Sequence, residues 1–172
     1  RLAFSEDATG SGRSFFEASV RAGLEGIVAK RRTSVYRPGE RSADWLKVAH
    51  EHRRPFVIGG VTSGRHYGIG ALLVGAWDPA RPERLTYLGH VGAGFGHGRL
   101  RELIGRLRAS PTSPFHQVPR DRREATWVRP DVVCIVGYRE LTSDRRLRHP
   151  VYRGLDPETD AAACLVPWAT GE

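Results

Sequence analysis

The sequence is organised around the run Leu24-Glu25-Gly26-Ile27-Val28-Ala29-Lys30-Arg31. Its centre is apolar and its charges lie only at the two ends, which is the pattern of a short buried strand. Glu25 stands five residues before Lys30. A strand of this kind fills a core with its middle and carries its end groups to a pocket.

A second short strand follows at Asp44-Trp45-Leu46-Lys47-Val48. Side chains alternate along a strand, so Trp45, Lys47 and Ala49 are expected on one face. The segment Tyr36-Arg37-Pro38-Gly39-Glu40-Arg41 lies between the two strands and predicts a polar turn. Two strands joined by a turn, with Glu25, Lys30 and Lys47 near their ends, make a candidate site for a nucleotide phosphate and its metal.

Together the two strands and the turn resemble motifs IV and V of ATP-dependent DNA ligases. They are most similar to the ligase part of bacterial DNA ligase D, the end-joining ligase that works with Ku. Further stretches resemble the C-terminal domain of the same family: Arg54-Pro55-Phe56-Val57-Ile58-Gly59-Gly60, Gly70-Ala71-Leu72-Leu73-Val74-Gly75, Gly89-His90-Val91-Gly92-Ala93-Gly94-Phe95 and Leu147-Arg148-His149-Pro150. Several motifs in the right order make the resemblance specific.

The resemblance implies an α+β fold class, in which the C-terminal piece of a nucleotidyltransferase (adenylation) domain is followed by an OB-fold β-barrel with one helix. Residues 1–52 are expected to be the adenylation piece and residues 53–172 the OB-fold domain. His50-Glu51-His52-Arg53-Arg54 reads as a charged linker between them.

The residue pattern of the second part independently predicts that barrel. Leu100, Leu103, Ile104 and Leu107 keep the spacing of one helix face. An order of three strands, one helix and two strands is typical of an OB-fold, a small Greek-key barrel that binds nucleic acid. The predicted strands cover about 55–62, 69–77, 84–92, 131–139 and 146–152, the helix covers about 97–109, and an irregular tail covers about 156–172.

At the N-terminal end, Ser14 and Glu17 have the spacing of a capping box, which predicts a helix starting near Phe15. Gly23 stands where a C-cap glycine belongs. This helix and the following strand are too few to bury their own apolar faces. The remaining N-terminal part of an adenylation domain is therefore an expected partner.

For the candidate site, the resemblance implies that Glu25 helps to hold Mg²⁺ or Mn²⁺ during nucleotidyl transfer, a role suited to a hard oxygen ligand. The resemblance also implies that Lys30 and Lys47 meet the phosphates of ATP and stabilise charge as it develops. They are the only lysines among 27 Lys and Arg residues. The alternative is that Glu25 is an ordinary surface glutamate at a strand entry.

Two positions depart from the family pattern. Ala49 stands where motif V usually has a second lysine, and Asp156-Pro157-Glu158-Thr159 stands where motif VI usually has an Arg-x-Asp-Lys run. Both departures remove positive charge from a phosphate site, and Arg153 is the one nearby candidate substitute. Neither lysine has the Lys-x-Asp-Gly context of the nucleophilic lysine, so this chain alone is expected to be inactive.

Two functions follow from these observations. The first is the C-terminal part of an ATP-dependent DNA ligase that seals nicked or broken double-stranded DNA in repair, with Ku as a further candidate partner. The second is a ligase-derived module that has lost catalysis and only binds nucleic acid. An upstream Lys-x-Asp-Gly run would favour the enzyme.

Positive charge supports a polyanionic partner. The formal net charge is +8 and nearly all cations are arginine, which binds phosphate bidentately. An arginine-rich composition from a genome of high GC content is the competing explanation. Arginines in the linker, the β-rich part and the predicted helix are the candidate DNA-binding residues: Arg53, Arg54, Arg65, Arg99 and Arg101.

Three weaker patterns favour structural roles. The glycines of 92–96 resemble a phosphate cradle, but a tight strand exit is the better interpretation. His50 and His52 have metal-ligand spacing without a third ligand nearby. Trp127 and Tyr138 are capable of stacking on bases, although buried strand aromatics are commoner.

Composition excludes some classes of protein. Cys134 and Cys164 do not form a metal motif or a disulfide framework. The sequence has no apolar run of about 18 residues and no signal-peptide pattern, so we expect a cytoplasmic protein of the bacterial nucleoid. The chain contains no methionine and starts at Arg1, from which we expect a fragment of a longer protein.

Overall fold

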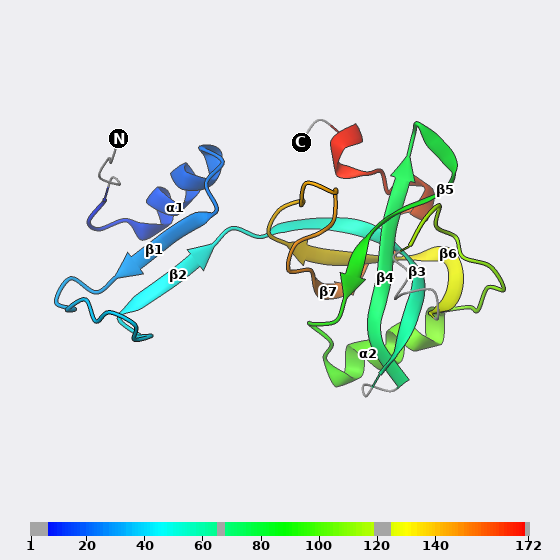
Figure 1. Cartoon of the computed structure of the whole chain (residues 1–172), viewed down its shortest axis with the longest axis horizontal. Coiled ribbons are helices and arrows are strands. Elements are labelled where there is room, and N and C mark those ends of the chain that lie inside the picture. The colour runs from blue at the N-terminus through cyan, green and yellow to red at the C-terminus, as the bar shows by residue number, and fades with distance from the viewer. Residues whose placement is uncertain (1–6, 65–67, 119–124, 171–172) are drawn as a thin grey trace. The chain divides into compact units, whose positions relative to one another are not determined.

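The computed structural model describes residues 7–64, 68–118 and 125–170, which are mostly β-strand with two α-helices. The chain divides into two units, residues 1–51 and residues 52–172 (Figure 1). Each unit has its own sheet. No described helix combines the length and the apolar character needed to cross a membrane.

The first unit starts with helix α1 (Gly12–Arg21). Its N-cap is Ser11, whose hydroxyl lies 2.8 Å from that of Ser14, so the predicted capping box is wrong. The C-terminal prediction is confirmed, because Gly23 has a φ of 71° and its amide donates to the Val20 carbonyl, while the Leu24 amide donates to Ser19. This is a Schellman end, which turns the chain directly into the following strand.

Strands β1 (Gly26–Lys30) and β2 (Trp45–Ala49) pair antiparallel, with Val28 opposite Lys47. Apolar side chains of this small sheet remain exposed within the unit, among them Val28, Leu46 and Val48. A two-stranded sheet and one helix do not bury such faces, as the sequence predicts.

The second unit is a five-stranded antiparallel sheet in the order β5-β4-β3-β6-β7, as Figure 1 shows. Helix α2 stands between the third and fourth strands of this unit, which is the predicted OB-fold order. The elements are β3 (His52–Gly64), β4 (Gly68–Asp78), β5 (Arg81–Val91), α2 (His97–Arg106), β6 (Thr126–Tyr138) and β7 (Val151–Leu155).

Backbone hydrogen bonds link the two ends of this sheet. The Leu147 amide donates to the Leu88 carbonyl and the Tyr152 amide donates to the Ala93 carbonyl. The main apolar cluster includes side chains from all five strands, and Leu100 and Leu103 of α2 join it. The helix thus contributes its apolar face to the core of the barrel, as its spacing predicts.

A second cluster forms around Phe115, in the segment between α2 and β6. A Cβ on Gly59 would lie 2.5 Å from the Phe115 ring, and one on Gly75 would lie 2.8 Å from it. Trp127 packs edge-on against the same ring at 6.2 Å between centroids. The two glycines therefore make room for an aromatic ring against the sheet.

Some element boundaries differ from the prediction. β3 begins at His52, so residues 52–54 belong to a strand and not to a linker. Residues 146–150 precede β7 and form one side of a hairpin, described below, instead of a regular strand. The tail carries two short 3₁₀ helices, η2 (Ala161–Ala163) and η3 (Pro167–Ala169).

Candidate functional site

Two of the three predicted site residues of the first unit are in contact. The Nζ of Lys47 donates to the Oε1 of Glu25 at 2.7 Å. Both side chains are more than half exposed, at 60% and 63%. The pair is therefore an accessible ion pair that a ligand can reorganise at small cost.

Gly26 explains why this contact forms. Strict alternation along a strand would put Glu25 on the face opposite Lys47. Gly26 has a φ of 141°, which residues with a side chain rarely adopt, and this backbone interrupts the alternation. A Cβ at this position would also lie 2.2 Å from the Val48 carbonyl oxygen, so the close approach of the strands requires glycine.

Lys30 lies opposite Trp45 in the register, at the far end of the same pair of strands. Its Nζ stands 4.4 Å from the centroid of a Trp45 ring, a cation–π contact. Trp45 is held in turn by Tyr36, at 5.3 Å between ring centroids, and by a hydrogen bond from its indole to Ser34. The Lys30 ammonium is thus positioned by an aromatic side chain.

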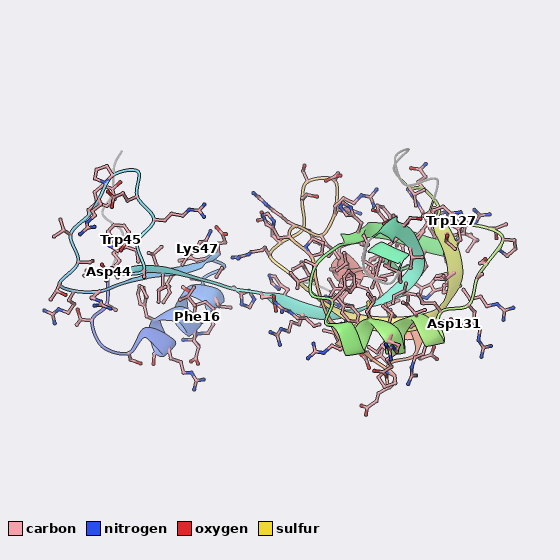
Figure 2. All side chains as sticks on the ribbon, turned by 90° about the horizontal axis from the view of Figure 1, so that it is seen from below. Phe16, Asp44, Trp45, Lys47, Trp127 and Asp131 are labelled. Atoms are coloured by element: carbon pink, nitrogen blue, oxygen red, sulfur yellow. The ribbon has the colours of Figure 1, made fainter. Side chains whose placement is uncertain are left out.

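Trp45 and Lys47 lie on the side of the ribbon opposite α1, whereas Phe16 lies on the α1 side (Figure 2). Since Lys30 pairs with Trp45 and Val28 with Lys47, the two lysines share that open face. Ala49 falls on it as well, by the alternation of β2. The predicted placement of Trp45, Lys47 and Ala49 on one face therefore agrees with the register.

The segment that replaces motif VI is a turn closed by its own carboxylate. Asp156 accepts hydrogen bonds from the amides of Glu158 and Thr159 and from the Thr159 hydroxyl, at 2.7 to 3.2 Å. The hydroxyl bond, helped by the two amides, holds the pKa of Asp156 below its usual value. This turn presents acidic groups and no cation of its own.

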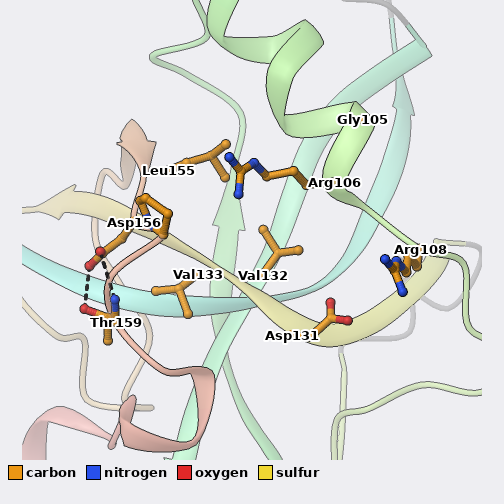
Figure 3. A pocket seen from close by; sticks show the side chains of 10 residues that line it. Gly105, Arg106, Arg108, Asp131, Val132, Val133, Leu155, Asp156 and Thr159 are labelled. Carbon is orange, nitrogen blue, oxygen red and sulfur yellow. Dashed lines mark hydrogen bonds between the residues drawn. The ribbon is translucent and has the colours of Figure 1, made fainter.

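A cleft of about 430 Å³ lies beside this turn, between the end of α2 and strands β6 and β7 (Figure 3). Arg106 and Arg108 line it together with Asp131 and Asp156. Its lining charges therefore balance, which gives no preference for an anion. Arg153 is not among the lining residues; its backbone carbonyl accepts a hydrogen bond from Arg99 at 3.3 Å.

The predicted DNA-binding arginines fall into two groups. Arg53 and Arg54 begin β3, and Arg54 donates to the Thr170 hydroxyl at 2.9 Å. Arg99 and Arg101 are exposed on α2. Arg65 lies outside the described residues.

The sequence analysis missed the arginines between β6 and β7. Arg145, Arg146 and Arg148 lie there, and Arg145 and Arg148 are exposed. The clustered positive charge of Arg145-Arg146-Leu147-Arg148 is visible in the sequence. Residues from 146 onward were instead predicted to be part of a strand.

Gly94 approaches β7 closely, since a Cβ there would lie 2.2 Å from the Tyr152 carbonyl oxygen. Tyr138 is 4% exposed and His52 stacks on it at 5.2 Å between ring centroids. Tyr138 is therefore not an open platform for bases. Across the described ranges, no three His, Cys, Asp or Glu side chains group to hold a metal ion.

Comparison with known families agrees with the two units. The family described as "ATP dependent DNA ligase domain" matches residues 6–49. The family described as "ATP dependent DNA ligase C terminal region" matches residues 65–159, more than half of the chain. The first match contains the Glu25 and Lys47 pair, and the second covers most of the barrel.

Individual relatives agree with these matches. The multifunctional non-homologous end joining protein LigD of Pseudomonas aeruginosa is 37% identical over 166 residues, covering 93% of this chain and 20% of that protein. The crystal structure of the ligase domain of M. tuberculosis LigD superimposes with a TM-score of 0.63 at 37% identity, covering 91% of this chain and 52% of that chain.

A mycobacterial DNA ligase D complexed with ATP and MES superimposes with a TM-score of 0.58 at 36% identity, again covering 91% of this chain and 52% of that one. The chain thus spans about a fifth of the curated relative and about half of the solved ligase domains. On these matches, the chain belongs to the family of the C-terminal region of ATP-dependent DNA ligases.

Proposed function

We propose that this chain is the C-terminal part of a LigD-like ATP-dependent DNA ligase, with residues 1–52 completing an adenylation domain and residues 53–172 forming the DNA-binding OB-fold domain. The complete enzyme transfers AMP from ATP to its own lysine and then to a DNA 5′-phosphate. Attack by the neighbouring 3′-hydroxyl then seals the nick and releases AMP. The P. aeruginosa relative is named as a non-homologous end joining protein, which supports a role in end joining. The resemblance to bacterial DNA ligase D makes Ku a candidate partner.

The observation that carries the proposal is the open face shared by Glu25, Lys30 and Lys47. Two ammonium groups on one small sheet are suited to the phosphates of a nucleotide and to charge that develops at the α-phosphate. The Lys30 ammonium lies against Trp45 and the Lys47 ammonium against Glu25. Both contacts are on an exposed surface, so a phosphate is able to reach the two cations.

Glu25 fits a role beside a divalent cation. Mg²⁺ in nucleotide enzymes is usually held by one or two carboxylates together with substrate phosphates, so a single exposed carboxylate such as Glu25 is a suitable protein ligand. A bound Mg²⁺ or Mn²⁺ would neutralise phosphate charge. Glu25 would hold such an ion in place of its contact with Lys47, and the Lys47 ammonium would then be available to phosphate.

The segment at the position of motif VI supports the alternative function, a module that binds nucleic acid without catalysis. The Asp156 turn supplies carboxylates where the family has cations that orient the outgoing phosphates of ATP. Arg153 is the candidate replacement in this segment. If Arg153 does not compensate, the chain is a ligase-derived module that binds nucleic acid without adenylation.

A chimera distinguishes the two functions. In the chimera, this chain replaces the matching half of the M. tuberculosis ligase domain. The other half of that domain supplies the nucleophilic lysine. We expect the chimera to form a covalent AMP adduct and to seal nicked duplex, while this chain alone forms no adduct. Glu25→Gln and Lys47→Gln should each lower the rate of adduct formation by about 10²-fold.

Glu40→Gln and Arg41→Gln, in the turn between the strands, are the matched controls and should leave that rate within about twofold. A folded chimera that binds nicked DNA without any AMP adduct would support the decayed module instead. Equal rates in the site and control variants would remove the assigned roles of Glu25 and Lys47.

A further inference from the structure

A hairpin with several internal hydrogen bonds connects β6 to β7, and we call residues 139–149 the arginine hairpin. The amides of Arg139 and Thr142 donate to the carbonyls of Arg148 and Arg146, and Leu141 bridges Leu147. The Thr142 side chain also hydrogen-bonds to Asp144 and to both backbone groups of Arg146. These bonds define one shape for the loop.

The arginine hairpin is also anchored to the barrel. Leu147 is 6% exposed and belongs to the main core, and its amide donates to Leu88 of β5. The Arg146 guanidinium lies 4.7 Å from the centroid of the buried Tyr87 ring. Arg146 therefore holds the hairpin in place, which leaves Arg145 and Arg148 as its outward arginines.

Backbone strain is concentrated here. Within the described ranges, the non-glycine residues with positive φ are Arg145, at 59°, and His149, at 51°. Such conformations cost on the order of 1 to 3 kcal/mol each and are kept where a structure fixes a functional geometry. A surface loop without a function would more simply use glycine or asparagine at these two positions.

The two exposed arginines keep donors available. The guanidinium carbon of Arg145 lies over the Trp168 ring, 4.6 Å from its centroid, and this cation–π contact uses none of the N–H donors of Arg145 in a hydrogen bond. Arg148 pairs with Glu140, and both side chains are more than half exposed. An exposed pair of this kind is worth at most about 1 kcal/mol, so a phosphate competes with Glu140.

The hairpin continues the basic surface of β3. The Arg145 guanidinium lies over the Trp168 ring. Thr170, two residues later, accepts a hydrogen bond from Arg54. Arg53, next to Arg54 on β3, lies opposite Gly137 of the adjoining strand β6, close to the start of the hairpin. The C-terminal segment and the β3–β6 ladder thus connect arginines from two parts of the sequence, the start of β3 and the arginine hairpin.

We propose that the arginine hairpin is a preorganised clamp for the phosphate backbone of duplex DNA, with Arg145 and Arg148 as its contacts and Arg146 as its anchor. The inference rests on the proposed DNA-binding function and names the surface that performs it. Rigid arginines suit repeated phosphates, because little conformational entropy is lost when they bind. Backbone contacts of this kind position a duplex without reading its sequence.

Binding of the whole 172-residue chain to a fluorescent nicked duplex, measured by anisotropy across a salt series, tests the inference. The double variant Arg145→Gln/Arg148→Gln should lower affinity by roughly tenfold and reduce the salt slope by about two. The double variant Arg145→Lys/Arg148→Lys keeps both charges and should retain most of the slope. Glu140→Gln removes the competing carboxylate and should raise affinity.

Arg81→Gln/Arg84→Gln is the matched control, since these exposed arginines lie at the other end of β5 from Leu88. Glu158→Gln is the control for Glu140→Gln. Thermal unfolding of each variant confirms that the barrel is intact.

Equal losses in the hairpin and control variants, or an unchanged slope in the hairpin variant, would overturn the inference while leaving DNA binding in place. Affinity unchanged by Glu140→Gln would contradict competition at Arg148. Absence of binding by the wild-type chain would overturn the inference together with the DNA-binding part of the proposed function.

Discussion

Gly26 lies opposite Ala49 with a φ of 141°, and a Cβ on it would come within 2.2 Å of the Val48 carbonyl oxygen. Gly26→Ala must therefore push the two strands apart in addition to straining the backbone. We expect a loss of about 2 kcal/mol in the local stability of β1–β2, seen as roughly 30-fold faster amide hydrogen exchange. Gly12→Ala is the control, because no atom lies within 4 Å of its Cβ and alanine favours the helix. Similar exchange in the two variants would contradict this account of Gly26.

Tyr152 is 1% exposed, and its hydroxyl has no hydrogen-bond partner in the part of the chain described. A buried polar group without a partner costs about 1 to 3 kcal/mol, so removing it should be neutral or favourable. We expect Tyr152→Phe to match or exceed the wild type by up to about 1 kcal/mol in urea unfolding at pH 7. A clear loss of stability would show that the hydroxyl has a partner, such as an ordered water.

The same hydroxyl predicts a pH dependence. Burial raises the pKa of Tyr152 from 10 to about 12. The folded state therefore keeps a proton that the unfolded state loses, so this contribution to stability is present below pH 10 and disappears as the pH rises towards 12. In urea unfolding between pH 9 and pH 11, the wild type should lose more stability than Tyr152→Phe. Parallel curves would contradict the raised pKa.

At the residue scale, the sequence predicted candidate site residues but not the contacts that they make. Glu25, Lys30 and Lys47 stand out because charges end two apolar runs. The Glu25–Lys47 pair and the Lys30–Trp45 contact depend on the register of β1 against β2 and on the conformation of Gly26. Two short strands determine their register only weakly from pattern alone, so these contacts were not predictable.

Strand β2 carries the element-scale prediction. The register places Ala49 on the face of Lys47, where the family usually has a second lysine. Ala49→Lys in the chimera should raise the rate of AMP adduct formation about threefold to tenfold, because added charge near the α-phosphate favours the transition state. Ala43→Lys adds the same charge in the turn before β2 and should have no such effect. A rate equal to or below that of the unchanged chimera would mean that Ala49 lies outside the phosphate site.

Element boundaries were predictable where periodicity was strong. α2 and the centres of β3, β4 and β5 follow their apolar spacing. The assignment of 146–150 to a strand was wrong because Arg145 and His149 adopt positive φ, and neither residue signals a turn in the sequence as glycine does. The interpretation of 52–54 as a linker was wrong because a strand end tolerates charge that a strand centre does not.

For the whole molecule, the order of strands and helix predicted the OB-fold barrel. The apolar spacing of the sequence did not reveal the second apolar cluster, which forms around Phe115. That cluster depends on Phe115 meeting Gly59 and Gly75, which come from distant parts of the sequence. Glycine in a strand suggests close approach without saying what approaches. Trp127 packs edge-on against Phe115 and is partly buried.

The burial of Tyr138 and the packing of Trp127 on Phe115, together with a net charge of +8, favour binding through phosphates over stacking on bases. The chain should bind nicked duplex through phosphates, with about three to five neutralised, in keeping with the modest footprint of one OB-fold module. Since each phosphate contributes about −0.9 to the slope of log affinity against log salt, affinity should fall roughly 40- to 500-fold between 50 and 200 mM salt. Two nicked duplexes of unrelated sequence should differ by less than about twofold, because backbone contacts carry no base information. Fluorescence anisotropy across a salt series measures both the salt slope and the preference between duplexes. A flat salt response would mean that the arginines are only a solvated surface. A large preference for one duplex would mean that the barrel reads bases.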